Sequence, residues 1–449
     1  MITAIASAFF FAGVITCVVL HLNMVYAVAF GAVCFVTAAL AQRFLFVDIL
    51  KMMFKGIKSS FGVFLNIFFI GIMTGLWRSS GTIAFFVYYG IKIIPQNLFL
   101  LFAYLIPALL SYLIGTNYGT TGTVGVVLLV LGTSGGVNPV YICAAVICGA
   151  YFGDRAAITS GNTNLVAACT GTDVRDNLKQ LLFNAIAPTL LTCVFFTVLS
   201  IFNPSSATSS GIAEDIKLTF VLSPWVLIPA VLILVLPIFR LSVKKAMTLS
   251  FISAGIVSYF VQKMPFLDIL RTAVFGFVPK GTDSFSQLIG GGGFMSMLNV
   301  FFLIVISSTY SGIFNGTRML EIEEKALENI AKKIGVFPTS ILTAIFANCV
   351  ACSQTLAVIL HAQLTRKVYE TRNISKKEFA VNISDTSSVI AGLIPWNVSC
   401  SVPFGMLGAD LNVIPFLFFL YITPLCSLVR FYVMEGRKKK RDAMPSARP

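Results

Sequence analysis

The sequence predicts an all-α polytopic membrane protein with two inverted-topology repeats, re-entrant hairpins and broken transmembrane helices. Hydrophobic residues make up 57% of the chain and charged residues only 11%, whereas soluble proteins carry about 25% charged residues. Apolar runs long enough for a helix to cross a bilayer recur along the whole chain. Polar, glycine-rich stretches interrupt these runs at corresponding places in two halves. Because the alternation typical of a membrane barrel is absent, helices are the spanning elements.

The net charge of +14 resides in short loops and in the C-terminal sequence RKKKRDAMPSARP. This distribution is typical of positive-inside topology signals and not of a nucleic-acid surface. We therefore expect the lipid bilayer as partner, no nucleic acid, a location in the cell (inner) membrane, and cytoplasmic N- and C-termini. The first apolar run, 2–22, lacks a basic n-region and a cleavage site, so it is expected to be a retained span.

The cysteine and histidine content argues against an enzyme. Ten cysteines lie scattered through apolar runs and are expected to be reduced core residues. Cys349 and Cys352 form one CxxC without a second pair, which is weak evidence for a metal or redox site. Only His21 and His361 are present, and His361 is expected to be solvated or interfacial. No cofactor is expected, although Na⁺ or H⁺ could be transported.

The first half of the chain divides into two predicted units. Residues 1–60 hold spans at 2–22 and 24–41 and a basic loop at 43–60. Residues 61–202 form transport repeat 1, with a span at 61–77 and an interfacial stretch at 79–94. The long run 98–131 is interrupted by GTNYGTTGTVG, whose four glycines disfavour a continuous helix and predict a hairpin with its tip at 117–121. The next run breaks at 153–164, reading GDRAAITSGNTN, and a last span follows at 181–202.

The second half repeats this order after a linker. Residues 203–288 are the linker, with an external loop at 203–214, two spans at 218–239 and 246–262, and a second external loop at 263–288. Residues 289–434 form transport repeat 2, with a span at 290–310, an interfacial helix at 318–333 and a hairpin at 338–366 with its tip at 348–354. A broken segment follows at 385–397, reading DTSSVIAGLIPWN. Residues 435–449 are a basic cytoplasmic tail.

Internal matches indicate a duplication. FGVFLNIFF at 61–69 resembles FMSMLNVFF at 294–302, which aligns Leu65 with Leu298. The same offset in residue number pairs Thr120 with Ser353 and Asn164 with Asn397. The pairs Asp154/Asp385 and Asp173/Asp410 follow at a slightly smaller and a slightly larger offset, which we attribute to short loop insertions. Repeat 1 begins inside and repeat 2 begins outside, so the repeats are predicted to be inverted, an architecture typical of secondary transporters.

Two acids within the apolar background are candidates for ion or proton coupling. A charged aspartate in the bilayer costs about 2.5–3.5 kcal/mol, so Asp154 and Asp385 are expected to be either functional or structural carboxylates paired with a neighbour. Arg155 is the expected charge partner of Asp154. A sodium ion needs several oxygen ligands, and Asp154 with Asn164 is the candidate sodium site.

Further polar residues are candidates for the same site. Asn164 and Asn397 are either ligands or helix caps at the breaks. Asp173 and Asp410 are expected at helix termini, and Trp396 is expected to pack the second break. Four residues at the hairpin tips are either cation or substrate ligands or partners of the local backbone: Thr120, Thr121, Ser353 and Gln354.

The two broken stretches resemble the motifs of the NhaC family of sodium/proton antiporters. GDRAAITSGNTNLVA keeps much of a family motif that reads like GDKMSPLSDTTNLA, including Gly153, Asp154, Thr163 and Asn164, and AGLIPWN keeps the LIPWN of the second motif. The resemblance implies paired hairpins, inverted repeats, sodium or proton coupling and a binding role for Thr163. The chain departs from the family at Gly161, where the motif has a second acid.

Other departures remove hydroxyls from the implied cation site: Ala157 and Ile158 replace a serine and a proline, and Ala391-Gly392 replaces Ser-Pro. Two hypotheses therefore stand. The first is a sodium/proton antiporter working by alternating access, with Asp154 as the coupling carboxylate. The second is a proton- or sodium-coupled carrier of a small organic acid or amino acid. A membrane enzyme or a channel is a third class, disfavoured by the repeats. A homo-oligomer is possible for each.

Overall fold

The computed structural model describes residues 2–20, 22–59, 61–204, 209–236, 239, 241–279, 289–317 and 324–442. Over these ranges the protein is helical, and its one β-bridge joins Phe277 to Gly291. Four helices in this part of the chain are long and apolar enough to span a membrane, and six spans result if each of two bent helix pairs counts as one. The prediction of an all-helical polytopic membrane protein is confirmed.

The N-terminal segment contains three helices. They are α1 (Ile2–Val19), α2 (Met24–Ala41) and α3 (Phe46–Ser59). Helices α1 and α2 lie at the two predicted spans, and α2 is long and apolar enough to cross a membrane. The stretch predicted as a basic loop is mostly the amphipathic helix α3. Its lysines leave one side polar, while Ile49 is fully buried.

The first half continues with a turn at the predicted hairpin and a bend at the predicted break. Its elements are α4 (Phe61–Ser79), α5 (Thr82–Ile93), η1 (Gln96–Leu98), α6 (Phe99–Ile114), α7 (Asn117–Thr120), η2 (Thr121–Gly125), α8 (Val126–Ser134), α9 (Pro139–Ala156), α10 (Gly161–Thr170) and α11 (Val174–Phe202). Gly115, at φ 78°, turns the chain between α6 and α7. Helix α9 runs through Ala156, so the break is shorter than predicted. The bend between α9 and α10 is 42°.

The middle of the chain is more helical than predicted. It contains α12 (Ser209–Thr219), η3 (Pro224–Leu227), α13 (Ile228–Val235), α14 (Val243–Phe260) and α15 (Phe266–Phe275). The stretches predicted as external loops, 203–214 and 263–288, thus include part of α12 and the whole of α15. Residues 205–208 and 280–288 of those stretches lie outside the described residues.

The second half has the same kinds of element. They are η4 (Phe294–Met297), α17 (Leu298–Thr317), α18 (Glu324–Ile334), α19 (Val336–Ala351), α20 (Gln354–Thr371), α21 (Lys376–Asp385), α22 (Ser387–Ile390), η6 (Ala391–Leu393), α23 (Val398–Leu407), η7 (Leu411–Phe416) and α24 (Phe418–Asp442). The predicted interfacial helix is α18 from Glu324 onward, and its earlier residues are not described. The predicted tail is helical to Asp442 as part of α24.

Helix bounds recur at a fixed interval in residue number, which we call the repeat interval. It is the interval from Phe61, the start of α4, to Leu298, the start of α17. The same interval carries both bounds of α6 onto those of α19. It also carries the bent pair Pro139–Ala156 and Gly161–Thr170 onto Lys376–Leu393 and Val398–Leu407, which bends by 50°. Of the residue matches seen in the sequence, Asp173/Asp410 has the repeat interval. The others have a shorter offset and are displaced from the helices by about one turn or more.

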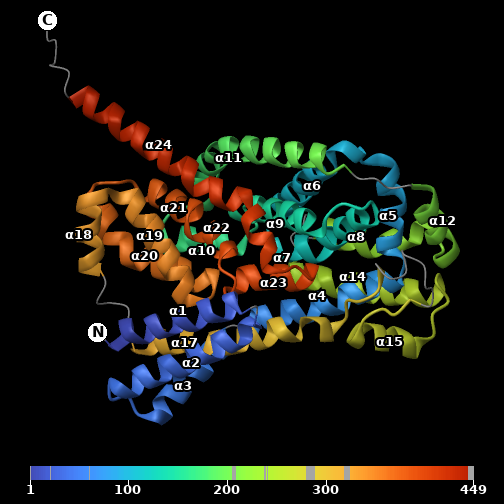
Figure 1. Cartoon of the computed structure of the whole chain (residues 1–449), viewed down its shortest axis with the longest axis horizontal. Coiled ribbons are helices and arrows are strands. Elements are labelled where there is room, and N and C mark those ends of the chain that lie inside the picture. Colours follow the sequence, from blue (N-terminus) through green and yellow to red (C-terminus); the bar gives the residue numbers. More distant parts are fainter. Residues whose placement is uncertain are drawn as a thin grey trace, which may run out of the picture.

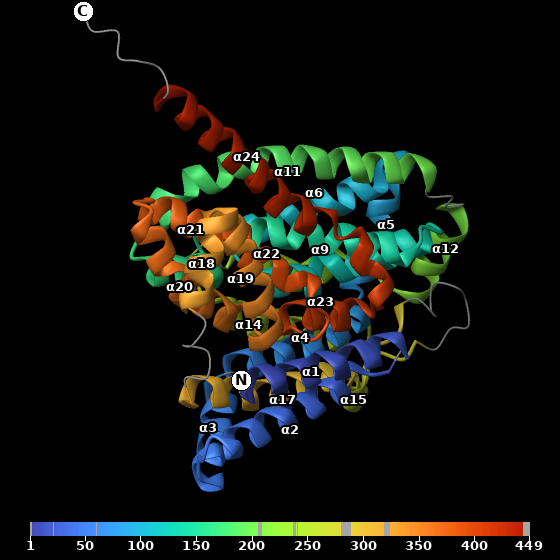
Figure 2. The ribbon, with the colours of Figure 1, turned by 60° about the vertical axis from the view of Figure 1, so that its left-hand side comes forward.

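The two matched segments at the start of each half lie side by side and run antiparallel. Phe64 and Phe301 are related by the repeat interval, and their ring centroids lie 5.3 Å from each other. Phe68 packs against Phe294 at 5.4 Å. Rising numbers along α4 therefore pair with falling numbers along η4 and α17. Figures 1 and 2 show both helices in the lower layer of the molecule, with α1 and α2.

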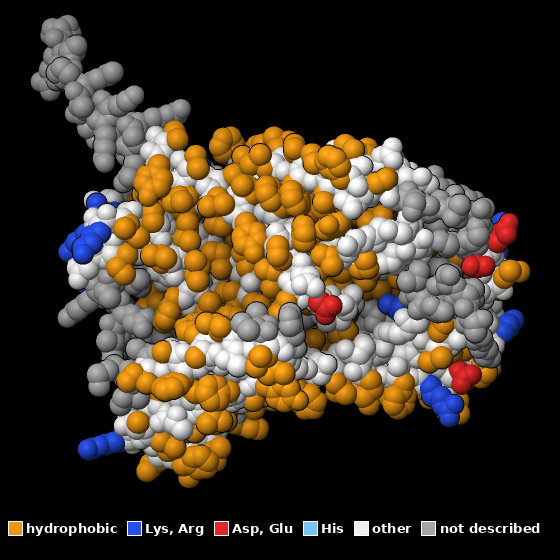
Figure 3. Space-filling view, in the orientation of Figure 1, with side chains coloured by type: hydrophobic (Ala, Val, Ile, Leu, Met, Phe, Trp, Pro, Cys, Tyr) orange, Lys and Arg blue, Asp and Glu red, His pale blue; other side chains and the backbone are white. Residues whose placement is uncertain are grey.

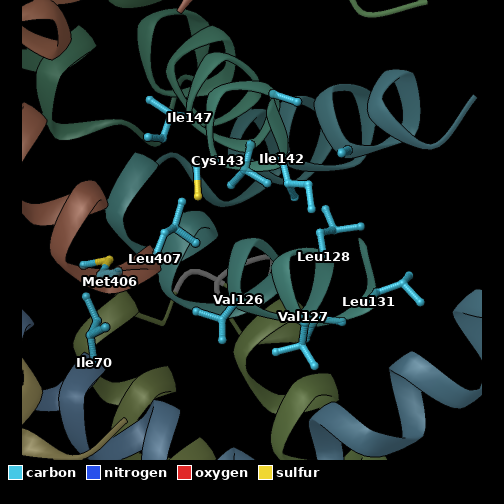
Figure 4. Close-up of a cluster of buried hydrophobic side chains, with 14 of the residues drawn as sticks. Ile70, Val126, Val127, Leu128, Leu131, Ile142, Cys143, Ile147, Met406 and Leu407 are labelled. Atoms are coloured by element: carbon cyan, nitrogen blue, oxygen red, sulfur yellow. The ribbon is translucent and has the colours of Figure 1, made fainter. Parts of the chain in front are cut away.

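The upper layer holds the hairpins and the bent helices (Figures 1 and 2). Helices α6 and α9 make the closest packing there, because a Cβ atom on Gly153 would lie 2.1 Å from the Tyr112 amide nitrogen. The buried cluster of Figure 4 joins Ile70 of α4, Val126 of α8, Ile142 of α9 and Leu407 of α23. This cluster places helices of both bent pairs at the centre of the molecule.

The surface is polar at its ends and apolar between them. In Figure 3, Lys, Arg, Asp and Glu side chains gather mostly at the left and right ends, and hydrophobic side chains cover most of the face between. This distribution suits a slab of lipid around the middle of the molecule. The α12 region and helix α21 lie toward opposite ends of the view in Figure 1.

Candidate functional site

Asp154 lies in the last turn of α9, at the first bend, and is 7% exposed. The Ser160 hydroxyl donates to its Oδ1 at 2.9 Å. The Thr163 hydroxyl donates to the carbonyl oxygens of Asp154 and Arg155, both at 3.2 Å. These bonds tie the end of α9 to the start of α10. Among the described residues, no basic side chain pairs with the Asp154 carboxylate.

Arg155 pairs with Asp385 and not with Asp154, so the predicted charge partner is wrong. Its Nε donates to Asp385 Oδ1 at 2.9 Å, and its Nη2 donates to the same oxygen. Asn184 and Ser427 donate to the other carboxylate oxygen at 2.9 and 2.7 Å. Both side chains of this salt bridge are buried, at 1% and 0% exposure. Each carboxylate oxygen has donors, which favours the structural alternative for Asp385.

The helix register shows that the two acids are not equivalent. The repeat interval relates Asp154 to Ala391, Arg155 to Gly392 and Cys148 to Asp385. The sequence-based pairing of Asp154 with Asp385 is therefore wrong. A Cβ atom on Gly392 would lie 2.8 Å from the Tyr151 hydroxyl, so this position has no room for a second arginine. The arginine at the centre comes from the first half alone.

In the first hairpin tip, some polar atoms form hydrogen bonds and others have no partner in the described chain. The Thr120 hydroxyl donates to the Thr116 carbonyl at 2.9 Å, the local backbone alternative. Thr121 Oγ1 and Asn117 Nδ2 are buried without a hydrogen-bond partner in the described chain. Residues Thr121–Gly125 form a π-helical turn, a feature that is frequent at functional sites.

The second tip carries an equivalent amide. Asn117 and Gln354 are related by the repeat interval, and each is the first residue of its helix after an extended N-cap residue. That N-cap is Thr116 in the first tip and Ser353 in the second, where no side-chain capping bond forms. The Gln354 amide donates to the Ser388 carbonyl at 2.6 Å, and its oxygen accepts from Ser399 Oγ at 3.5 Å.

A central polar network joins both tips to both bends. It consists of Tyr118, Asn162, Gln354, Ser388 and Ser399. The Tyr118 hydroxyl lies 3.2 Å from Ser399 Oγ, and Ser388 Oγ donates to Asn162 Oδ1 at 3.3 Å. The Asn162 backbone amide donates to Ser160 Oγ at 3.1 Å, and Ser160 donates to the Asp154 carboxylate, so the network borders the unpaired acid. Asn162 Nδ2 has no hydrogen-bond partner among the described residues.

Two contacts of this region are related by the repeat. The Tyr151 hydroxyl donates to the Ser399 carbonyl oxygen at 2.7 Å. The repeat interval relates Tyr151 to Ser388 and Asn162 to Ser399, so the Ser388–Asn162 bond is the counterpart of this contact. Sequence reasoning missed Tyr118, although it lies within the predicted tip. It also passed over Asn162 and Ser388 inside the two singled-out stretches.

The two predicted asparagine ligands are engaged with backbone groups. The exposed Asn164 donates to the carbonyl oxygens of Ile158 at 3.0 Å and Ser160 at 2.7 Å. Asn397 accepts from the Ser399 amide at 3.0 Å and donates to the Asn348 carbonyl at 3.1 Å. These contacts favour the helix-capping alternative. The repeat interval relates Asn397 to Ser160, the N-cap of α10.

Other side chains singled out in the sequence have structural partners. The expectation of a solvated His361 is wrong: the ring is fully buried, and its Nε2 lies 2.8 Å from Ser340 Oγ. The Trp396 ring packs edge-on against Phe10, as expected at a packed break. Asp173 caps α11 by accepting from the Arg175 amide at 2.7 Å. Within the described ranges, no group of three or more His, Cys, Asp or Glu side chains could hold a metal ion.

The fold and the site define the class of helical membrane transporters, because two bent helix pairs and two hairpin tips meet at a buried carboxyl. Residues 149–434 match the model of the Na⁺/H⁺ antiporter family, and the chain belongs to this family. It is 28% identical to the Na(+)/H(+) antiporter NhaC of Bacillus subtilis over 431 residues, covering 94% of this chain and 95% of the relative.

Two further relatives cover most of the chain. The Na(+)/H(+) antiporter NhaC of Alkalihalophilus pseudofirmus is 26% identical over 91% of both chains. The Malate-2H(+)/Na(+)-lactate antiporter of B. subtilis is 24% identical over 84% of this chain and 82% of its own length. These matches confirm the resemblance seen in the motifs.

Proposed function

We propose that the protein exchanges sodium for protons by alternating access, with Asp154 as the coupling carboxylate. The observation that carries the proposal is the difference between the two buried acids. Asp385 is neutralised by Arg155, whereas Asp154 accepts a hydrogen bond from the neutral Ser160 hydroxyl. A buried carboxylate without a positive partner is costly. Binding either a proton or a sodium ion removes this cost, and competition between the two for one carboxyl produces antiport.

The residues around Asp154 suit a hard cation. Sodium prefers oxygen ligands, and the bend supplies the Asp154 carboxylate, the Ser160 hydroxyl and carbonyl groups freed between α9 and α10. The first hairpin tip holds a further buried hydroxyl, that of Thr121, without a hydrogen-bond partner in the described chain. Asn164 and Asn397 then act by holding the bends in place. Asp385 acts as the counter-ion that fixes Arg155, and sodium is a substrate of the protein.

Inverted repeats underlie the proposed alternating access. The fixed repeat interval and the antiparallel packing of α4 on η4 and α17 support a two-fold axis that relates the halves. In such an architecture one arrangement of the two repeats opens the site to one side of the membrane. The arrangement in which the two repeats exchange conformations opens it to the other side. We assign both termini to the cytoplasmic side of the cell membrane, because the basic segments lie there by the positive-inside rule.

A carrier of a small organic acid or amino acid is the second candidate. The observation that favours it is the space at Gly161, where an added Cβ atom would meet nothing within 4 Å. The absence of a side chain beside the Asp154 bend leaves room for a solute larger than a metal ion. One of the relatives is named as an exchanger of malate and lactate. Coupling through Asp154 would be common to both candidates.

The test uses liposomes that hold the full chain and a trapped pH dye, with the interior more acidic than the exterior. External sodium is expected to make the interior more alkaline, and Asp154→Asn is expected to lose this response. Asp173→Asn is the matched control, because Asp173 lies outside the central network and caps α11. If folded protein responds to neither sodium, lithium nor potassium, the antiporter proposal fails. A response to added malate, lactate or arginine in the same vesicles would then support the second candidate.

A further inference from the structure

An apolar groove runs between α11 and α24 on the hydrophobic face. Its volume is about 590 Å³, and its walls include Phe183, Ile186, Leu191, Leu425 and Val429. Phe183 is 66% exposed and Val429 63% exposed. Figure 3 shows that hydrophobic side chains cover the surface over these two helices. The groove therefore has the shape and the surface to hold a hydrocarbon chain.

A basic cleft lies beside this groove, between α18, the α20–α21 turn and α24. Its volume is about 860 Å³, and its described lining residues include Lys332, Lys333, Arg372 and Arg430 but only one acid, Glu378. The described lining thus carries an excess of three positive charges. Lys332, Lys333 and Arg372 are exposed, and Arg430 is half-buried at the inner wall. Such a cleft attracts an anionic group.

The two hollows share Ser427 and Arg430, which line both of them. Arg430 Nη1 donates to Asn184 Oδ1, and Asn184 in turn donates to Asp385 at 2.9 Å. Ser427 donates to Asp385 directly at 2.7 Å. The junction of groove and cleft is therefore one or two hydrogen bonds from the buried Arg155–Asp385 pair.

We propose that the groove and the cleft together form a site for an anionic phospholipid, with its phosphate at Arg430 and an acyl chain between α11 and α24. An apolar groove alone would accept any lipid, and a basic cleft alone would accept any anion. Their junction at one arginine selects a molecule with a hydrocarbon chain and a negative head. The planar guanidinium matches phosphate oxygens, and basic pockets between membrane helices bind such head groups.

The site links the lipid to the centre of the protein. A phosphate at Arg430 shares the guanidinium with Asn184, and Asn184 is one of the donors that hold Asp385. Bound lipid thereby contacts the network that fixes Arg155. Lipid binding at this site does not depend on which ion or solute is transported.

The experiment measures binding to the full chain in neutral detergent by native mass spectrometry, with thermal unfolding as a second readout. Phosphatidylglycerol and phosphatidylcholine with identical acyl chains are the probes. We expect retained phosphatidylglycerol to exceed retained phosphatidylcholine at least tenfold, and only phosphatidylglycerol to raise the Tm. Arg430→Gln is expected to abolish this preference. Arg271→Gln, which removes an exposed arginine of α15 away from both hollows, is the control and keeps it.

A second variant addresses the groove and covers the case in which Arg430→Gln does not fold. Val429→Asn makes the exposed wall of the groove polar without changing any charge, and we expect it to reduce retained phosphatidylglycerol several-fold. Equal binding of the two lipids would overturn the proposal, because the groove alone would then explain the contact. A Tm increase of the same size with inorganic phosphate would also overturn it, because the cleft would then be a small-anion site.

Discussion

At the residue scale, the Arg155–Asp385 ion pair is a buried contact that joins the two halves. Breaking a buried pair by removing one partner costs about 3–5 kcal/mol, whereas removing one neutral donor costs about 1–3 kcal/mol. We therefore expect Asp385→Asn to destabilise the protein more than Ser427→Ala does. Thermal unfolding in detergent measures both variants. A smaller loss for Asp385→Asn than for Ser427→Ala would contradict the assignment of Asp385 as a structural counter-ion.

Gly161 provides a residue-scale test of the cation site. An added side chain meets open space there, and the NhaC-like motif has an acid at this position. Gly161→Asp is expected to lower the sodium concentration needed for half-maximal vesicle alkalinisation, because a second carboxylate near Asp154 adds an oxygen ligand and a negative charge. Gly161→Asn, which has the same size but no charge, is the control. An equal shift of the half-maximal sodium concentration in both variants would indicate that the effect comes from helix capping and not from the added carboxylate.

The sequence allowed Asp154 to be singled out as an acid in an apolar background, but not its partners. The adjacent Arg155 was the obvious counter-ion, yet successive residues on a helix point in different directions. Arg155 instead reaches Asp385, an acid in the other half of the chain. No local pattern encodes a contact of such sequence separation. The contact between Tyr118 and Ser399, which also joins the two halves, was missed for the same reason.

At the element scale, the packing of α6 on α9 depends on two glycines. An added Cβ atom would lie 2.3 Å from the Tyr104 carbonyl oxygen at Gly149 and 2.1 Å from the Tyr112 amide nitrogen at Gly153. Because both obstacles are backbone atoms, we expect Gly153→Ala to cost about 3 kcal/mol or more, the upper end for overpacking. Gly255→Ala in α14 is the control, since its Cβ would make an ordinary contact of 3.7 Å.

Unfolding of both alanine variants in detergent checks this expectation, and equal stability would contradict the close approach of α6 and α9. Of these two glycines, Gly153 explains why the predicted break began too early. Gly153 was interpreted as a helix breaker, but it lies inside α9 and serves the contact with α6. The helices are interrupted at or next to both predicted tips, where glycines at 115–125 and polar residues at 348–354 divide otherwise apolar runs.

At the scale of the whole molecule, the proposed inversion of the repeats places particular segments on opposite sides of the membrane. We expect single cysteines at Leu218, which is 87% exposed in α12, and at Asn373, in the α20–α21 turn, to react with a membrane-impermeant thiol reagent from opposite faces. The measurement needs a chain whose ten native cysteines are replaced, and that parent is the control. Labelling of both positions from one face would contradict the inverted topology.

The sequence indicated a duplication, but of the matched residues only the pair Asp173/Asp410 has the register of the helix bounds. Leucine and phenylalanine are common in membrane spans, so identical residues aligned Leu65 with Leu298, whereas the helix bounds relate Phe61 to Leu298. The repeated helix bounds are a property of the backbone and need no shared residues. The order of spans, hairpins and breaks could be predicted because each leaves a local pattern of apolar and polar residues.

The unequal charge of the two bends bears on how such a chain can have arisen. A symmetric pair of half-length chains would carry every side chain twice, with Arg155 present again at the position of Gly392. That position has no room for it, because even a Cβ atom would lie 2.8 Å from the Tyr151 hydroxyl. In this fold, two identical half-length chains would therefore leave no space for the second arginine, and the asymmetric Arg155–Asp385 pair requires two halves of different sequence.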